Sequence, residues 1–463
     1  MPLPLAEVLA DHWPDYARRH RSRLVTAHYR AVRAVCQCRT PALGGHRYRC
    51  NPCNREHYAY HSCNHRSCPQ CGGLDQQRWS ARQEARLLPG IDYYLITFTV
   101  PKELRRFCKR HPKEAYDLLL RESAAALQEV AHTELGARLG FTSVFHSWGR
   151  QIQHHPHLHI IVPAAAFDDK SATLHFPDDP EYFLTENRLA ARFRNRLEIA
   201  LKDTERYPGL RTELQRDAPG VFSHRTKWVV DSRHVGRGKR ALRYLARYVF
   251  KSAFHPNRLL GYEPDGRIKL SWQNSDTARW GVMRLTPDSF LDRFLTHVLP
   301  KGFVRVRHYG WLSGAAKRTR QIVRALLDLR EELAPVLPPT PTVCCPVCHA
   351  PMIRVARLDT LGAIRGTTLT MLLQPQLQTH PGRWPNSARP AAALFLNYWI
   401  CRSCASRLLP TVASPIFQHP IPPHSGSEPV GLETRRSAEH TPRQIARSLI
   451  PQLTGPQIKK QNA

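Results

Sequence analysis

The sequence predicts an α+β fold in which a mixed domain lies between two small cysteine-rich units. Three observations lead to this prediction. Short runs of β-branched and aromatic residues alternate with longer segments of helical period. Paired cysteines gather near the start of the chain and again after residue 340. A proline-rich segment, Pro335 to Pro341, has the composition of a linker and precedes the second cysteine group.

The expected elements begin with a helical lead-in at residues 11–35 and a cysteine- and histidine-rich segment at 36–73. The second segment has too few apolar residues to fold around its own core, so it needs metal staples. Tyr93–Val100 is β-branched and aromatic and ends at Pro101, which predicts a buried strand. Further strands are expected at Phe141–Trp148 and His157–Val162. Helices are expected at 74–90, 112–138, 185–202, 239–252, 287–299 and 315–333.

These elements divide the chain into four expected units. Residues 1–85 form the helical lead-in and a zinc-binding domain, and residues 86–334 form the mixed α and β domain. Residues 335–409 form the linker and a zinc ribbon. Residues 410–463 are rich in proline, serine and basic residues and are expected to be disordered.

The charge balance indicates a polyanionic partner. The 463 residues include 68 Lys+Arg and 37 Asp+Glu, a formal net charge of +31. A basic tail alone does not explain the excess, because arginine is also dense at 237–247 and 305–320, within segments expected to fold. Nucleic acid is the commonest partner for such a surface.

Neither a secretory signal nor a run of ~18 apolar residues is present, so a cytosolic protein without a membrane segment is expected. Thirteen cysteines in that compartment favour metal binding over disulfides.

The N-terminal cysteines have zinc-ligand spacing. Pairs two residues apart can grip one tetrahedral ion from a tight turn. The spacing supplies ligands for two ions. The expected first site is Cys38, His46, Cys50 and Cys53, and the expected second site is Cys63, Cys68 and Cys71 with His61 or His65. Ordinary buried cysteines or a redox pair are the alternatives, and the number of pairs disfavours both.

Two more pairs predict a C-terminal zinc ribbon. They are Cys345 with Cys348 and Cys401 with Cys404, and about fifty residues separate the pairs. Cys108 and Cys344 are expected to be structural or incidental.

The segment QHHPHLHIIVP, residues 153–163, predicts a metal-binding strand. Pro156 disfavours a helix. In a strand, His157 and His159 project from one face and Leu158 from the other. Two imidazoles on one rigid strand can chelate an ion that polarises a phosphate. A histidine-rich surface strand is the alternative.

The helix expected at 239–252, KRALRYLARYVFKS, carries Tyr244 and Tyr248 one turn apart. The apolar stripe of Leu242, Leu245 and Val249 predicts that the tyrosines face away from the core. A basic band runs beside the tyrosines and is expected to contact DNA: Arg240, Arg243, Arg247 and Lys251. A tyrosine hydroxyl can be a covalent nucleophile. A solvated basic helix is the alternative.

Together these blocks resemble the two-tyrosine HUH transposases of the insertion-sequence-ninety-one family. CRTPALGGHRYRCNPC and SCNHRSCPQC look like the family's zinc-binding domain, and HSWGRQIQHHPHLHIIVP and YLARY look like its HUH and tyrosine motifs. FLTHVLPKGFVRVRHYGWLS, residues 294–313, looks like its basic block. The resemblance runs from about residue 20 to residue 350.

The resemblance implies an HUH-type antiparallel sheet with flanking helices, the histidines on a central strand and the tyrosines on a helix nearby. His157 and His159 match the metal-binding histidines, and Tyr244 and Tyr248 match the nucleophiles. It implies Mg²⁺ or Mn²⁺ as catalytic ion, with a third protein ligand for which Gln153 is the candidate. It also implies rolling-circle transposition through a 5′-phosphotyrosine on single-stranded DNA or an element-end hairpin.

Other functions explain parts of the sequence. A replication initiator or relaxase shares the chemistry, but the zinc knuckles and the block at 294–313 favour the transposase. A non-enzymatic zinc-finger DNA-binding protein explains the charge and the cysteines but not the histidine strand or the tyrosine pair. A carboxylate-triad transposase is disfavoured because acidic residues are few. No phosphate-binding GxxxxGK[ST] loop is present, so strand unwinding is expected to come from a host helicase.

Overall fold

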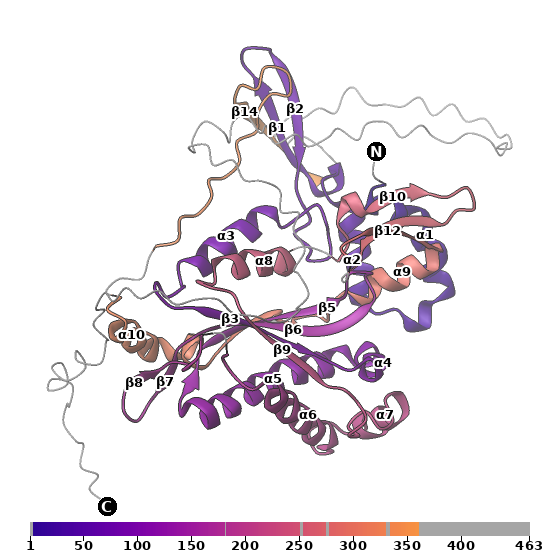
Figure 1. Ribbon diagram of the computed structural model, residues 1–463. Helices are drawn as coiled ribbons and strands as arrows, with labels where there is room; N and C mark the ends of the chain where they lie inside the picture. The colour runs from indigo at the N-terminus through magenta and orange to yellow at the C-terminus, as the bar shows by residue number, and fades with distance from the viewer. Residues whose placement is uncertain (1–2, 181, 251–252, 275–276, 330–333, 361–463) are drawn as a thin grey trace, which may run out of the picture.

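A five-stranded antiparallel sheet forms the centre of the protein (Figure 1). The computed structural model describes residues 3–180, 182–250, 253–274, 277–329 and 334–360. The strand order is β13-β5-β6-β3-β9. The strands are β3 (Tyr93–Thr99), β5 (Phe141–Trp148), β6 (His154–Pro163), β9 (Val229–His234) and β13 (Val306–Tyr309). The three strands predicted from the sequence are therefore confirmed.

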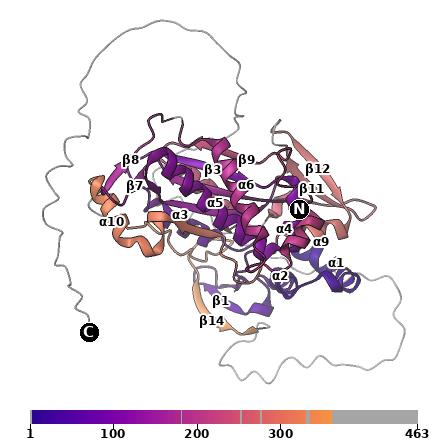
Figure 2. The same ribbon diagram turned by 90° about the horizontal axis from the view of Figure 1, so that it is seen from below.

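Four helices cover one face of this sheet (Figures 1 and 2). They are α4 (Arg105–Arg110), α5 (Pro112–Leu135), α6 (Glu186–Lys202) and α7 (Leu210–Asp217). Phe98 of β3 and Leu158 and Ile160 of β6 are buried against them. Side chains alternate along a strand, so residues 157 and 159 must lie on the other face.

The opposite face is covered by α3 (Gly73–Glu84) and α8 (Lys239–Phe250), which lie side by side above it (Figure 1). Leu242 and Leu245 of α8 pack on Val144 of β5 and Ile161 of β6. Gly238, directly before α8, has φ +73°, and a Cβ there would lie 2.7 Å from the Tyr93 ring. Glycine at this position allows α8 to start close to the sheet.

The N-terminal helices pack on a later part of the chain. Helices α1 (Leu5–Arg19) and α2 (Thr26–Gln37) share a core with α9 (Pro287–Thr296) and with the antiparallel sheet β10 (Leu259–Tyr262), β11 (Ile268–Gln273) and β12 (Trp280–Leu285). One hydrophobic core therefore contains residues from both sides of the expected boundary at residue 85.

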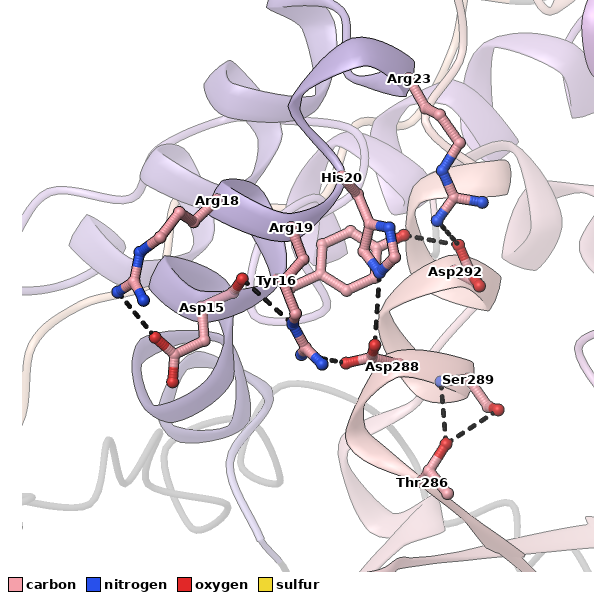
Figure 3. Close-up of polar contacts among 10 residues, drawn as sticks. All are labelled: Asp15, Tyr16, Arg18, Arg19, His20, Arg23, Thr286, Asp288, Ser289 and Asp292. Carbon is pink, nitrogen blue, oxygen red and sulfur yellow. Dashed lines mark hydrogen bonds and ion pairs between the residues drawn. The ribbon is translucent and has the colours of Figure 1, made fainter.

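Polar contacts join α1 to α9 (Figure 3). Tyr16 donates to Asp292 at 2.5 Å, and Arg19 pairs with Asp288 at 2.7 Å. Burial and the bond to Asp292 raise the pKa of Tyr16. Thr286 caps α9 by accepting from the Ser289 amide at 3.2 Å. These contacts fix the first helix against α9, which lies more than 260 residues later in the chain.

A small antiparallel sheet, β14-β1-β2, lies above α3 in Figure 1 and joins both cysteine groups. Its strands are β1 (Gly45–Cys50), β2 (Arg55–Tyr60) and β14 (Ile353–Leu358). The other described strands are β4 (Arg138–Leu139), β7 (Ala166–Asp168) and β8 (Thr173–His175), and the last described α-helix is α10 (Lys317–Leu326).

Several predicted elements need correction. The lead-in is two helices, because Leu24 and Val25 are extended. The helix predicted at 315–333 ends at Leu326, with Asp328 in the left-handed region at φ 54°. Strands β10–β12 were not predicted. None of the described helices is long and apolar enough to cross a membrane. Residue 251, Cys401, Cys404 and the tail at 410–463 lie outside the described residues.

Candidate active site and zinc clusters

Three histidines meet on the sheet face beneath α8. His157 and His159 come from β6, and His146 comes from β5. One nitrogen of each ring lies within 4.8 Å of the others. His146 is the register partner of His157, which places both on the same face of the sheet. The predicted orientation of His157 and His159, with Leu158 on the opposite face, is confirmed.

Hydrogen bonds orient two of the rings. Nδ1 of His157 donates to the His155 carbonyl at 2.7 Å. Nδ1 of His159 lies 3.0 Å from the Thr97 hydroxyl, its cross-strand neighbour. A carbonyl can only accept, so the bond to His155 keeps the proton of His157 on Nδ1 and leaves Nε2 to face a metal ion. The Thr97 hydroxyl holds the His159 ring and can accept from its Nδ1 in the same way. The two bonds thus prepare the rings as ligands.

Burial keeps these histidines neutral. It lowers the pKa of His157 to about 4 and that of His159 to about 3, from an ordinary 6.5. Burial also lowers the pKa of His146 well below its usual range. Only a neutral imidazole can bind a metal ion, so all three rings are in the ligand form at neutral pH.

His146 joins the two predicted histidines, in addition to the candidate Gln153. Gln153 lies in the turn between β5 and β6, where its side chain packs against Gly149. Its place as a metal ligand stays a prediction. His146 was not predicted as a ligand, because its position opposite His157 depends on the register of β5 against β6, which local spacing does not reveal. Alternation along β5 was the available signal.

Tyr244 faces the histidines from α8. Its ring centroid lies 6.1 Å from that of His159, with the rings nearly perpendicular at 84°. Tyr244 is half-buried and packs on the cluster that contains Leu242 and Leu245. The expectation that the tyrosines face away from the core is thus wrong for Tyr244, because its position on the helix borders the apolar stripe. The side chains of Tyr248 and Arg247 lie outside the described residues.

The basic band on α8 is partly neutralised. Arg240 and Arg243 are exposed. Arg243 pairs with Glu84 of α3 at 2.9 Å, and Lys239 lies 3.5 Å from the same carboxylate. The position of Glu84 beside this helix depends on the packing of α3 on α8 and was not predicted. Such exposed pairs are weak, so Arg243 can exchange Glu84 for a phosphate.

A groove of about 390 Å³ lies between the loop at 64–72, α3 and the segment before β13. Its lining includes Arg66, Trp79, Val249 and Arg305. Arg305 donates to the Val249 carbonyl at 2.9 Å. Burial lowers the pKa of Arg305 only to about 10, so it stays charged at neutral pH, and its charge contributes to the lowered pKa of His146. The groove therefore combines an aromatic ring with buried positive charge.

The first cysteine cluster is Cys38, Cys63, Cys68 and Cys71, with all four sulfurs within 4.8 Å of one another. Cys38 and Cys71 are 3.2 Å apart at Sγ, and Cys63 and Cys71 are 3.5 Å apart. Four thiolates at ~2.3 Å from one zinc ion would be roughly 3.8 Å apart, so the cluster needs little expansion to hold the ion. It is a Cys₄ set without a histidine.

This corrects the expected ligand sets in three ways. Cys38 joins the second predicted site, because the chain after α2 turns back toward residue 61 and Arg39 donates its amide to the His61 carbonyl. His65 is not in the group: its Nδ1 accepts from the Ser67 amide at 3.2 Å. His46 is also absent from it and packs edge-on against His61, 4.9 Å between centroids.

The second cluster is Cys50, Cys53, Cys345 and Cys348. The sequence placed the first two with His46 and the last two with Cys401 and Cys404. The structure instead brings the two pairs together through β1 and β14, which are antiparallel partners. Spacing along the chain identified the pairs but could not say which pairs meet.

Comparison with known proteins gives the class of this chain. Residues 140–320 match the family described as "Putative transposase", and residues 8–100 match the family described as "Transposase zinc-binding domain". The class is thus a transposase with a zinc-binding domain before its transposase region. The chain belongs to the insertion-sequence-ninety-one family of transposases with an N-terminal zinc-binding domain.

Two relatives illustrate the match. The protein named "Putative transposase y4qJ" of Sinorhizobium fredii is 34% identical over 325 residues, covering 67% of this chain and 80% of the relative. The protein named "Transposase for insertion sequence element IS801" of Pseudomonas savastanoi pv. phaseolicola is 24% identical over 298 residues, covering 61% of this chain and 69% of the relative. No solved structure matches. Family membership gives DNA as the substrate, strand transfer as the general activity and zinc as a structural metal.

Proposed function

We propose that this transposase nicks and joins single-stranded DNA at insertion-sequence ends by tyrosine attack on phosphate, in rolling-circle transposition of the HUH type. One observation carries the proposal: Tyr244 faces a cluster of three neutral histidines at 6.1 Å from His159. A nucleophile, a metal-binding face and a strongly basic chain are then found in one protein.

His146, His157 and His159 would hold the catalytic ion. Imidazole nitrogens suit first-row transition ions better than they suit Mg²⁺, so Mn²⁺ fits this set better than Mg²⁺. The ion, when bound, supplies Lewis-acid polarisation of the scissile phosphate. The Thr97 hydroxyl and the His155 carbonyl keep the rings aimed toward it.

In the proposed step, the phenol oxygen of Tyr244 or Tyr248 forms a bond to the phosphorus, and the bond from phosphorus to the 3′ oxygen breaks. The phenol loses its proton and the departing 3′ oxygen gains one. The products are a 5′-phosphotyrosine and a free 3′-hydroxyl. The phosphodiester energy is retained, so the reverse attack can join strands without a nucleotide cofactor, and the second tyrosine permits a second cleavage.

The DNA strand would approach along the groove that Arg305 lines, and the charge of Arg305 acts on His146. Trp79 offers a ring for base stacking, and Arg66 and Arg305 offer charge for phosphates. Arg240, Arg243 and Arg247 of α8, together with Lys251, would contact the backbone of the strand or of an element-end hairpin. A host helicase would supply single strands. This substrate places the protein with DNA in the bacterial cytoplasm.

Zinc at the first cysteine cluster would shape one wall of this groove. Cys71 lies both in the cluster and in the groove lining, and Asn64 and Arg66 lie between the cluster's cysteines. The proposed ligands are Cys38, Cys63, Cys68 and Cys71. Loss of this ion would therefore disturb single-strand binding as well as the fold of the loop.

The test is a nicking reaction on labelled single-stranded DNA from the element ends, with Mn²⁺, Mg²⁺ or EDTA, run on a denaturing protein gel. The proposal expects a metal-dependent covalent band that the double variant Tyr244→Phe, Tyr248→Phe abolishes while DNA binding persists. A band that survives in the double variant would exclude these nucleophiles. Binding without any band would favour a non-enzymatic DNA-binding protein, and specific nicking at a plasmid origin would favour a replication initiator or relaxase.

A further inference from the structure

Two cysteine knuckles from distant parts of the chain meet at the small sheet. Cys50 ends β1, and Cys53 follows in the turn to β2. Cys345 and Cys348 lie in a turn before β14. The Sγ atoms of Cys50 and Cys348, 298 residues apart in sequence, are 3.4 Å from each other. All four sulfurs lie within 4.8 Å, and Cys50 and Cys345 are fully buried.

Backbone hydrogen bonds close the turn that holds Cys345 and Cys348. The Cys345 amide donates to the Ala350 carbonyl at 2.9 Å, and the His349 amide donates to the Cys345 carbonyl at 3.0 Å. This hydrogen bonding closes a tight turn that points both thiols of the pair the same way.

A left-handed residue directly follows the second cysteine of each knuckle. Asn54 has φ 52° and His349 has φ 59°. The same conformation follows two cysteines of the first cluster, at Arg39 (φ 60°) and Asn64 (φ 50°). This conformation is costly for residues other than glycine and persists only where the surroundings enforce it. Both clusters therefore have a left-handed residue directly after a cysteine. At Arg39 and His349 this conformation strains the β-carbon and does not by itself stabilise the fold.

We propose that Cys50, Cys53, Cys345 and Cys348 bind one Zn²⁺ ion that fastens the segment after the transposase region to the N-terminal zinc-binding domain. The two family matches cover residues 8–100 and 140–320, so neither includes Cys345 or Cys348. The site is a complete tetrahedral thiolate set, with no open position for substrate, so its role is structural. It depends on the cysteines alone and not on the proposed tyrosine chemistry.

The ion completes an arginine-rich sheet. Strand β1 contains Arg47 and Arg49 and pairs with β14, which contains Arg354 and Arg357. Glu56 of β2 is the acidic residue of the three strands. Arg357 lies opposite His46 and Arg354 opposite Tyr48, so these two arginines lie on the other face of the sheet from Arg47 and Arg49. The ion would thus hold together a sheet whose two faces both carry arginine. It would also fix the start of the C-terminal segment beside the hairpin.

Zinc counting on the full-length protein tests the ligand set. Two zinc ions per chain are expected, one in each cluster. The pairs Cys50→Ser, Cys53→Ser and Cys345→Ser, Cys348→Ser should each leave one ion, and all four changes together should still leave one. Cys344→Ser, next to the cluster, is the matched control and should leave two, as should Cys401→Ser with Cys404→Ser.

Other counts overturn the proposal. Three ions in the unaltered protein, with each pair of changes removing a different ion, would mean that the knuckles belong to separate sites. One ion in every variant and in the unaltered protein would mean that this cluster binds none. The ion retained by the first cluster reports that each variant still folds there.

A cleavage experiment tests the fastening role. The linker Pro335–Pro341 is accessible, with Val336 91% exposed, so a specific protease site can be placed there. After cleavage, the C-terminal fragment should co-elute with the rest until a zinc chelator releases it. In the Cys345→Ser, Cys348→Ser variant it should separate without chelator, while Cys344→Ser should behave like the unaltered protein. A fragment that stays bound after complete zinc removal would contradict the role.

Discussion

The hydrogen bond between Thr97 and His159 provides a sharp test of the histidine cluster as a metal site. Thr97→Val removes the hydroxyl that lies 3.0 Å from Nδ1 of His159 and keeps the shape of the side chain. Valine also favours a strand, so β3 should remain folded. Only the orientation of the ring and its tautomer lose support.

The expected magnitude follows from the role of the bond. Loss of a partner behind a metal-binding histidine typically weakens metal affinity by roughly 10- to 100-fold, which corresponds to about 1.4–2.7 kcal/mol. Burial of the ring favours this range over a smaller one, because no bulk water can replace the hydroxyl easily. The count of ligands is unchanged, so binding should weaken without disappearing.

The assay is titration of the full-length protein, with its zinc retained and no other ion bound, with Mn²⁺, followed by the paramagnetic signal of the free ion. Thr99→Val is the matched control: Thr99 lies on the same face of the same strand, opposite His157, whose Nδ1 bonds a backbone carbonyl instead. Thr97→Val should lower the affinity and Thr99→Val should not. Equal affinities in all three proteins, or an equal loss in both variants, would refute the reasoning.

Three further predictions concern the same face of the sheet. When no ion occupies the histidine cluster, burial depresses the pKa of His157 to about 4, while the unfolded chain titrates near 6.5. Between these pH values the unfolded state binds more protons, so the free energy of unfolding should fall as the pH drops through them. Urea unfolding at about pH 7.5 and 5 checks this, and equal free energies of unfolding would contradict it. Leu245→Ala, at a fully buried position between α8 and the sheet, should destabilise the protein by about 2–5 kcal/mol in the same assay, whereas Arg240→Ala on the exposed side should change stability little. Arg243→Ala breaks an exposed pair with Glu84, so the free energy of unfolding should change by less than about 1 kcal/mol. DNA affinity should depend less steeply on salt concentration. An unchanged salt dependence would show that Arg243 does not contact DNA.

Local pattern was enough to find the histidine strand. Alternation of His157 and His159 with apolar Leu158 predicted both the strand and its orientation, because period-2 patterning is a property of one segment. His146 was missed because it depends on the pairing of two strands. Glu84 was missed for a similar reason: it meets Arg243 only through packing of α3 on α8.

The cysteines show the same limit more clearly. The spacing of Cys50 and Cys53, and of Cys345 and Cys348, correctly marked knuckles, since a tight turn is local. Their meeting depends on β1 pairing with β14 across most of the chain, and no spacing rule contains that information. The adjacent histidine His46 was chosen as a ligand by proximity in sequence, yet the structure brings a distant thiol pair instead.

The central claim is tested most directly by identifying the residue that becomes covalently attached to DNA. Trypsin cuts after Arg243, Arg247 and Lys251, so the two tyrosines fall in separate peptides, YLAR from residue 244 and YVFK from residue 248. The protein would be reacted with Mn²⁺ and single-stranded DNA from the element end, digested with nuclease and trypsin, and examined by mass spectrometry. The account predicts a nucleotide on YLAR, on YVFK or on both, and none when EDTA replaces Mn²⁺. A nucleotide on any other peptide would contradict the assigned nucleophiles. If the DNA is cut but no peptide carries a nucleotide, covalent catalysis by tyrosine would be contradicted.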